Sequence, residues 1–128
     1  MAEMITLKTL PKATAQEVFD QGAAHLLKQG VRSVSGGGSC RYRGIQGRKC
    51  VGGCYIADDE YERRMEDISW DGLIHQTLKT PVPRKHAKLI RALQRIHDED
   101  EPSYWKWSLR ELAKKMRLKF KFENGVPE

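Results

Sequence analysis

Apolar residues recur at helical spacing in the stretch that follows Thr14. Positions three and four residues apart are apolar from residue 18 to residue 27, which is the pattern of a helix with one buried face. Thr14 and Glu17 form a capping-box signature, in which each side chain bonds the amide of the other residue. Gly30 suits the left-handed residue that ends many helices. The pattern therefore predicts a helix over residues 14–29.

A second apolar stripe follows the rigid sequence TPVPRK. Leu89, Ile90, Leu93 and Ile96 fall on one helical face, which predicts a helix from about residue 84 to about residue 98.

A third helix has two candidate starting points. Ser103 can cap it early, whereas Ser108 with Glu111 forms a second capping box. Trp107 and Leu112 flank that box at the positions of a hydrophobic staple. These features favour the later start, at Ser108.

The periodicity changes between residues 40 and 57. CRYRG and RKCVG flank GIQG, which predicts a β-hairpin in which Arg41 and Arg43 share one face and Tyr42 takes the other. Near the carboxyl end, RLKFKF alternates basic and apolar residues, which is typical of an edge strand.

These elements predict an α+β fold in one domain over residues 1–128, with about four helices packed around a small antiparallel β-hairpin or sheet. The hairpin region spans residues 40–57. A helical region follows over residues 59–117, where Asp58 or Asp59 and then Ser69 cap short helices. A basic edge strand or tail covers residues 118–128.

Positive charge is segregated along the chain, whose formal net charge is +6. No acidic residue occurs from Gln21 to Ala57 or from Lys114 to Lys121. Two sets of basic residues, one of which includes a tyrosine, are therefore candidates for contacting nucleic acid or an acidic protein surface. They are Arg41, Tyr42, Arg43, Arg48 and Lys49 in the hairpin, and Lys114, Lys115, Lys119 and Lys121 near the carboxyl end.

The amino-terminal sequence lacks the pattern of a signal peptide, and no apolar run reaches the length of a membrane span. Three cysteines in such a chain favour reduced thiols. We therefore expect a cytoplasmic protein without a membrane partner.

The cysteines allow two chemical alternatives. Cys40, Cys50 and Cys54 have spacing close to a zinc knuckle, with a fourth ligand to come from His25, His75, His86 or His97. No histidine stands at a recognisable offset, so buried thiols without a metal or other cofactor are favoured over a zinc site. Cys54 also precedes a candidate helix start that would activate a nucleophile. No base lies in a motif around it, which favours a protein that is not an enzyme.

The aromatic cluster YWKW, residues 104–107, is typical of a core. If part of it is exposed, that part becomes the best candidate for an interface anchor, because tryptophan is enriched at binding hot spots.

The segment CRYRGIQGRKCVGGCYIADDEY, with LKTLPKATAQEVFDQ before it and LIRALQRIHD after it, resembles a group of small, mostly uncharacterised proteins of bacteriophages and bacteria. The resemblance covers residues 5–98. It implies a phage accessory protein with no assigned catalytic residues, acting in the bacterial cytoplasm on a host or defence complex, as anti-CRISPR proteins do. Residues 114–122 lie outside it.

These observations predict a non-enzymatic, phage-encoded binding protein that obstructs a host or defence complex through a basic surface. The alternatives are a nucleic-acid-binding protein of low specificity and a zinc-stabilised module.

Overall fold

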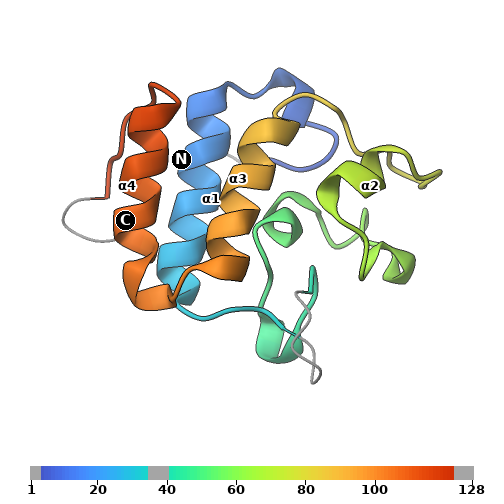
Figure 1. Cartoon of the computed structure of the whole chain (residues 1–128). Coiled ribbons are helices and arrows are strands. Elements are labelled where there is room, and N and C mark those ends of the chain that lie inside the picture. The colour runs from blue at the N-terminus through green and yellow to red at the C-terminus, as the bar shows by residue number, and fades with distance from the viewer. Residues whose placement is uncertain (1–3, 35–40, 123–128) are drawn as a thin grey trace.

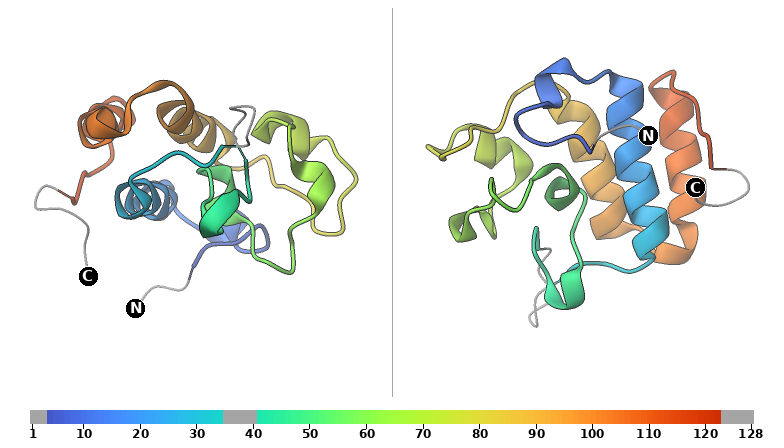
Figure 2. Two further views of the ribbon diagram at one scale, coloured as in Figure 1. Left: turned by 90° about the horizontal axis from the view of Figure 1, so that it is seen from below. Right: turned by 180° about the vertical axis from the view of Figure 1, so that it is seen from behind.

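Three helices form the centre of the molecule. The structure is a computed structural model that describes residues 4–34 and 41–122. α1 (Ala15–Gln29), α3 (Ala87–Glu99) and α4 (Trp105–Lys115) lie side by side in Figure 1, and the view from below in Figure 2 shows that each packs against the other two. Their facing sides are apolar and buried, with Leu26, Leu93 and Leu109 among the residues that water does not reach.

α1 has the ends that its sequence predicts. The Thr14 side chain accepts a bond from the Glu17 amide, and the Glu17 carboxylate accepts one from the Thr14 amide. Gly30 ends the helix in the left-handed conformation, with φ at 69°. This end directs the chain away from the three helices and toward segment 41–57.

α3 buries the predicted stripe of Leu89, Ile90, Leu93 and Ile96. The helix begins later than expected, because His86 has φ at 68° and its Nε2 lies 2.7 Å from the Ala13 carbonyl oxygen. His86 therefore belongs to the turn before the helix.

The predicted start of the last helix is wrong. α4 begins at Trp105, directly after a 3-10 turn over Pro102–Tyr104. Ser108 is an interior helical residue whose Oγ donates to Asp100 Oδ2 at 2.7 Å, so it caps nothing. Trp107 points away from the core instead of acting as a staple.

The predicted hairpin, and with it the α+β class, is wrong. Across residues 4–34 and 41–122 the structure contains helices and turns but no β-strand. Segment 41–57 holds two 3-10 helices, η2 (Ile45–Gly47) and η3 (Gly52–Tyr55). Two backbone bonds close a loop around η2, from the Cys50 amide to the Arg41 carbonyl at 3.0 Å and from the Gly44 amide to the Arg48 carbonyl at 2.7 Å.

Side chains take the backbone groups that a ladder of strands would need. The amides of Tyr42 and Arg43 donate to the Glu66 carboxylate at 2.9 and 3.0 Å. The Lys49 amide donates to Gln29 Oε1 at 2.8 Å. These three amides are therefore not available for strand pairing, because each already donates to a side-chain acceptor.

The expected edge strand fails for the same reason. Residues 118–122 alternate exposed basic and more buried apolar side chains, as predicted, and Phe122 is buried. At Lys119 the backbone bonds a side chain: the Lys119 amide donates to Gln16 Oε1 at 2.9 Å, and Gln16 Nε2 donates to the Lys119 carbonyl at 2.9 Å. The Leu118 amide donates to the Ala113 carbonyl of α4 at 2.8 Å. None of these bonds joins the segment to a second strand.

The remaining elements are short. The Ser69 side chain caps α2 (Trp70–Ile74) by accepting from the Gly72 amide at 3.1 Å. Asp58 and Asp59 lie in a turn, and the next helical residues are the 3-10 turn η4 (Arg63–Met65). A further 3-10 turn, η1 (Leu10–Lys12), precedes α1.

Candidate binding surfaces

Arg43 is bound within the protein and offers little to a partner. Its guanidinium donates to the carbonyls of Gly53 at 3.1 Å and Ile56 at 2.7 Å. It also forms an ion pair with Asp58 at 3.1 Å and lies 5.0 Å from the centre of the Tyr61 ring. These contacts tie the start of segment 41–57 to its end, so Arg43 supports the local structure.

Arg41 and Tyr42 are also directed inward. Arg41 Nε donates to the Arg43 carbonyl at 3.3 Å, and its guanidinium lies 4.0 Å from the Glu66 carboxylate. Tyr42 is buried, and its hydroxyl donates to the Ile68 carbonyl at 2.6 Å. The ring therefore cannot stack on a base without unfolding its surroundings.

Arg48 and Lys49 have a different setting, beside a pocket along α1. Within the described ranges neither of their side chains, nor that of the nearby Lys28, has an ion pair or hydrogen bond. The pocket has a volume of about 900 Å³. We call it the α1 groove; it is lined by Met4, Ile5, Glu17, Asp20, Gln21, Ala24, His25, Lys28, Gln29, Val31 and residues 46–49.

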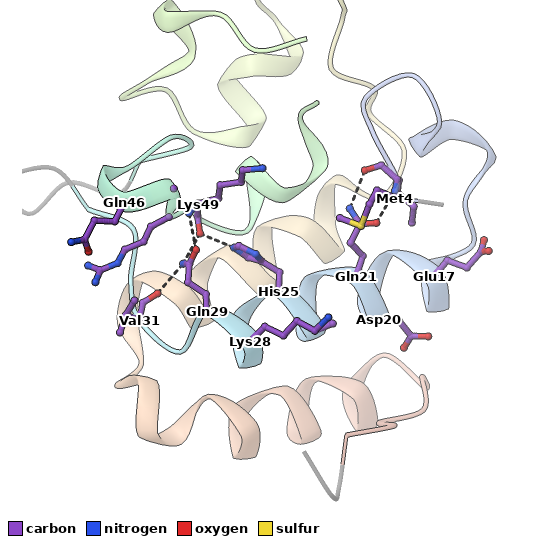
Figure 3. Close-up of a pocket in the computed structure, with 14 residues that line it drawn as sticks. Met4, Glu17, Asp20, Gln21, His25, Lys28, Gln29, Val31, Gln46 and Lys49 are labelled. Carbon is purple, nitrogen blue, oxygen red and sulfur yellow. Dashed lines mark hydrogen bonds between the residues drawn. The ribbon is translucent and has the colours of Figure 1, made fainter. Parts of the chain in front are cut away.

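Three polar side chains spaced four residues apart on α1 hold the walls of the groove (Figure 3). Gln21 exchanges two bonds with the backbone of Ile5, at 2.7 and 2.9 Å. Gln29 accepts from the Lys49 amide and donates to the Lys49 carbonyl, both at 2.8 Å. His25 Nε2 bonds the same carbonyl at 2.7 Å. The walls are extended segments fixed to one helix by its side chains.

His25 is held in its neutral form. Burial is the main cause that lowers the pKa of its imidazole from 6.5, and the neighbouring His97 and Lys49 lower it further. The bond to the Lys49 carbonyl acts in the opposite direction. A neutral ring whose Nε2–H donates to the Lys49 carbonyl fits both the burial of the ring and this hydrogen bond.

α4 exposes two of the aromatic residues in the YWKW cluster. Trp105 is buried and stacks on His97 with ring centres 5.8 Å apart. Tyr104 is 63% exposed and Trp107 is 60% exposed. Lys114 follows Trp107 by two helical turns and therefore shares its face.

The other basic groups near α4 are mostly open to solvent. Lys114 pairs with Glu111 at 3.3 Å, and Lys115 and Lys119 are exposed. Lys121 reaches back to α1 and pairs with Asp20 at 3.2 Å. We call the exposed side of α4 with these lysines the α4 face; it comprises Tyr104, Trp107, Lys114, Lys115 and Lys119.

The two predicted basic sets do not form one patch. The carboxyl-terminal segment and segment 41–57 lie on opposite sides of α1 in both Figure 1 and Figure 2. The structure thus divides the nine predicted site residues by role. Arg41, Tyr42 and Arg43 support the fold, Arg48 and Lys49 line the α1 groove, and the four lysines lie along α4 and the segment after it.

The two cysteines that the structure describes are buried. Cys50 and Cys54 are not disulfide-bonded to each other, and Cys40 lies outside the described residues. Burial raises the pKa of the Cys54 thiol to about 12, so this sulfur is protonated at neutral pH and unsuited to nucleophilic attack. In the described part of the chain, no three histidine, cysteine or carboxylate side chains gather closely enough to hold a metal ion.

The glycine pair beside these cysteines has a packing role. A Cβ built on Gly53 would lie 2.3 Å from the Tyr42 carbonyl oxygen. Gly52 and Gly53, which lie between Cys50 and Cys54, are packed against the backbone and ring of Tyr42.

The α1 groove was not predicted from the sequence. Its signal was nevertheless present as Gln21, His25 and Gln29, which are amide and imidazole side chains four residues apart on the edge of an apolar helix. Such a row can satisfy the backbone of a neighbouring extended segment.

No protein-family model matches the chain, and neither a curated protein nor a solved structure is significantly similar to it. Among the described helices, none has the length and apolar character required to cross a bilayer.

Proposed function

We propose that the protein is a non-enzymatic binding protein that obstructs an acidic surface of a host or defence complex through its α4 face. The observation that supports this most directly is the exposure of Trp107 on α4 and of Tyr104 directly before it. Exposed lysines lie in the last turn of the same helix and in the segment after it. Large aromatic side chains at the centre of an interface contribute much of its binding energy. Basic groups around them favour an acidic partner and accelerate its association.

The proposal moves the contact surface from segment 41–57 to α4. Charge reversal at Arg43 would break bonds to two carbonyls and an ion pair within the protein, so loss of binding in such a variant would not identify an interface. The lysines of the α4 face can be changed without this difficulty, because their side chains are exposed.

The resemblance to small phage and bacterial proteins supports the cytoplasm of a bacterial host as the setting. It covers residues 5–98, so binding through the α4 face is proposed for this chain alone. Proteins of this size obstruct a larger machine by occupying part of its surface, which requires an anchor and charge complementarity but no catalytic group. The high pKa of the Cys54 thiol is consistent with that mode of action.

Affinity capture with the full chain as bait tests the proposal. We expect a bacterial host lysate to yield a partner with an acidic surface, and the purified pair to form a complex again. Trp107→Ala should weaken that complex at least about tenfold, since truncating a hot-spot residue costs roughly 2 kcal/mol or more. The triple variant K114E/K115E/K119E should weaken it further and reduce its dependence on salt.

Lys88→Glu, compared with the single variant Lys114→Glu, is the charge-matched control, because both lysines are exposed and each substitution makes the same change in net charge. Circular dichroism of every variant should match that of the unchanged protein. A reconstituted complex that tolerates both Trp107→Ala and the triple lysine variant would contradict the proposal.

Binding of single-stranded nucleic acid is the second candidate, because exposed aromatic rings beside lysines also suit base stacking with phosphate contacts. A labelled oligonucleotide titrated at several salt concentrations distinguishes the two. Nucleic-acid binding requires log affinity to fall with log salt by about 0.7 per neutralised phosphate. If the oligonucleotide binds with this salt dependence and the triple lysine variant does not bind it, the partner of the α4 face is a nucleic acid and not a protein.

A further inference from the structure

One side of α1 carries its charges in a self-complementary order. Glu17, Asp20, Ala24 and Lys28 follow one another along the helix at spacings of three and four residues, and all of them line the α1 groove. Acidic groups occupy the amino-terminal part of this row and the basic group its carboxyl-terminal part. The small side chain of Ala24 lies between them.

Asp20 and Lys28 are each four residues from Ala24. At a rise of 1.5 Å per residue, they lie about 6 Å on either side of it along the helix axis. A two-fold axis through Ala24, perpendicular to the helix, would therefore set Asp20 of one chain beside Lys28 of a second chain, and the reverse. In such an isologous contact the same pair forms twice.

The apolar rim of the groove has the same order. Met4, next to the Ile5 backbone that Gln21 holds, is 66% exposed at the acidic end. Val31, whose carbonyl accepts from Gln29, is 38% exposed at the basic end. Figure 3 shows Met4 and Val31 at opposite ends of the groove. The two-fold axis that pairs Asp20 with Lys28 also brings Met4 of one chain toward Val31 of the other.

The ionic groups have free capacity for this contact. Lys28 and Arg48 form no ion pair within the described residues. Asp20 is held by Gln16 Nε2 at 2.8 Å and by Lys121 Nζ at 3.2 Å. A carboxylate has about four acceptor sites, so Asp20 can accept a further ammonium group.

We propose that the α1 groove is the self-association surface of a symmetric homodimer, in which α1 crosses its copy in antiparallel orientation at Ala24. A small residue at the crossing lets the two helix axes approach to about 8 Å. Exposed ion pairs contribute little individually, so the dimer is weak, depends on protein concentration and weakens with added salt. The proposal uses no residue of the α4 face and does not rest on the proposed function.

Sedimentation velocity of the full chain over a range of concentrations tests the proposal. We expect a reversible monomer–dimer equilibrium. Lys28→Glu sets two carboxylates against each other at both ends, and Asp20→Lys does the same with two ammonium groups. Each variant should weaken the dimer at least about tenfold, because two attractions are lost and two repulsions gained.

The decisive experiment mixes the two variants. In a mixed dimer of Asp20→Lys with Lys28→Glu, every ion pair is restored with reversed partners at one end, so dimerisation should return to near its original strength. Lys88→Glu, with the same change of charge outside the groove, should leave the equilibrium unchanged, as should Trp107→Ala. Circular dichroism checks that each variant is folded.

The position of the axis has its own test. Ala24→Cys places one new thiol where residue 24 meets its own copy, within the Cα separation of about 4.4–6.8 Å that a disulfide requires. Under mild oxidation this variant should form a covalent dimer that the unchanged chain does not form. A monomeric unchanged chain at every concentration, a mixture that stays monomeric, or an Ala24→Cys variant that does not cross-link would each overturn the proposal.

Discussion

The three-helix unit and the irregular segment from residue 41 to residue 68 are held together by different kinds of contact. α1, α3 and α4 bury apolar side chains against one another, and their backbone groups bond within each helix. The irregular segment has no ladder of its own. Its amides bond to side chains: to the carboxylate of Glu66 within the segment, and to the carboxamides of Gln29 in α1 and Gln94 in α3.

This difference determines what a substitution does in each region. Removing a methyl group from the helical core leaves a cavity, and the helices keep their own hydrogen bonds. Removing one clamping side chain from the irregular segment leaves several buried donors without an acceptor at once. Polar residues there should therefore be as important for stability as leucines are in the helices.

The largest effect is expected for Glu60→Ala. The buried Glu60 carboxylate accepts from the amides of Leu7, Lys8 and Ala57. An unsatisfied buried donor costs about 1–3 kcal/mol, so the free energy of unfolding should fall by about 4 kcal/mol. Urea denaturation measures the change. Asp59→Ala, at the exposed neighbouring position, should change it by less than about 0.5 kcal/mol; equal losses in the two variants would contradict the comparison.

Gly53→Ala should follow, with a loss of about 2–3 kcal/mol, because the added methyl group meets the rigid backbone of Tyr42. Gly30→Ala provides the contrast. No atom lies within 4 Å of a Cβ at that position, so only the left-handed backbone is penalised, at about 1 kcal/mol. Thermal unfolding ranks the two variants, and a larger loss in Gly30→Ala would argue against tight packing at Gly53.

Gln29→Ala should cost about 1–2 kcal/mol, since the Lys49 amide and the Val31 carbonyl lose the bonds to Gln29. The Lys49 carbonyl loses one of its two partners and keeps His25. Hydrogen exchange should show faster exchange at the Lys49 amide and unchanged protection in α3. If α3 loses protection equally, the irregular segment and the three-helix unit unfold as one cooperative structure, and the distinction between the two regions fails.

The smallest expected effect is the contribution of His25 to the loss of stability at acidic pH. The pKa of His25 is lower in the folded protein than its ordinary value of 6.5, chiefly because the ring is buried. Above about pH 6.5 the His25 ring is neutral in both the folded and the unfolded protein. Below that pH the unfolded chain binds the proton more readily, so the free energy of unfolding decreases as the pH is lowered. As the pH is lowered from about 7.5 to about 5.5, His25 should contribute a loss of at most about 1.4 kcal/mol. His25→Gln should show a smaller loss in urea denaturation than the unchanged protein, and an identical loss would exclude this contribution.

The sequence predicted the helices far better than the segments between them. The capping box at Thr14 and the stripe from Leu89 to Ile96 act within one element, so their periodicity is sufficient to place it. Segment 40–57 has the alternation of a hairpin, but Glu66 and Gln29, which are distant in sequence, take the amides that strand pairing needs. The sequence of residues 40–57 itself contains no pattern that indicates these long-range bonds.

The candidate surfaces were predicted only in part. Exposure within the YWKW cluster depends on where α4 begins: a start at Trp105 buries Trp105 and Ser108 and turns Trp107 outward. Arg43 and Arg48 look alike in the sequence, yet one is bound to carbonyls and the other lines the α1 groove. The role of each arginine depends on its tertiary contacts, which cannot be read from the distribution of charge along the sequence.

The link between Gln16 and Lys119 joins positions 103 residues apart. During synthesis on a ribosome, α1 emerges well before the segment that bonds its outer side. Contacts so distant in sequence slow folding, because most of the chain must be ordered before they form. The nascent protein will therefore display the outer side of its first helix until residues near Lys121 have left the exit tunnel.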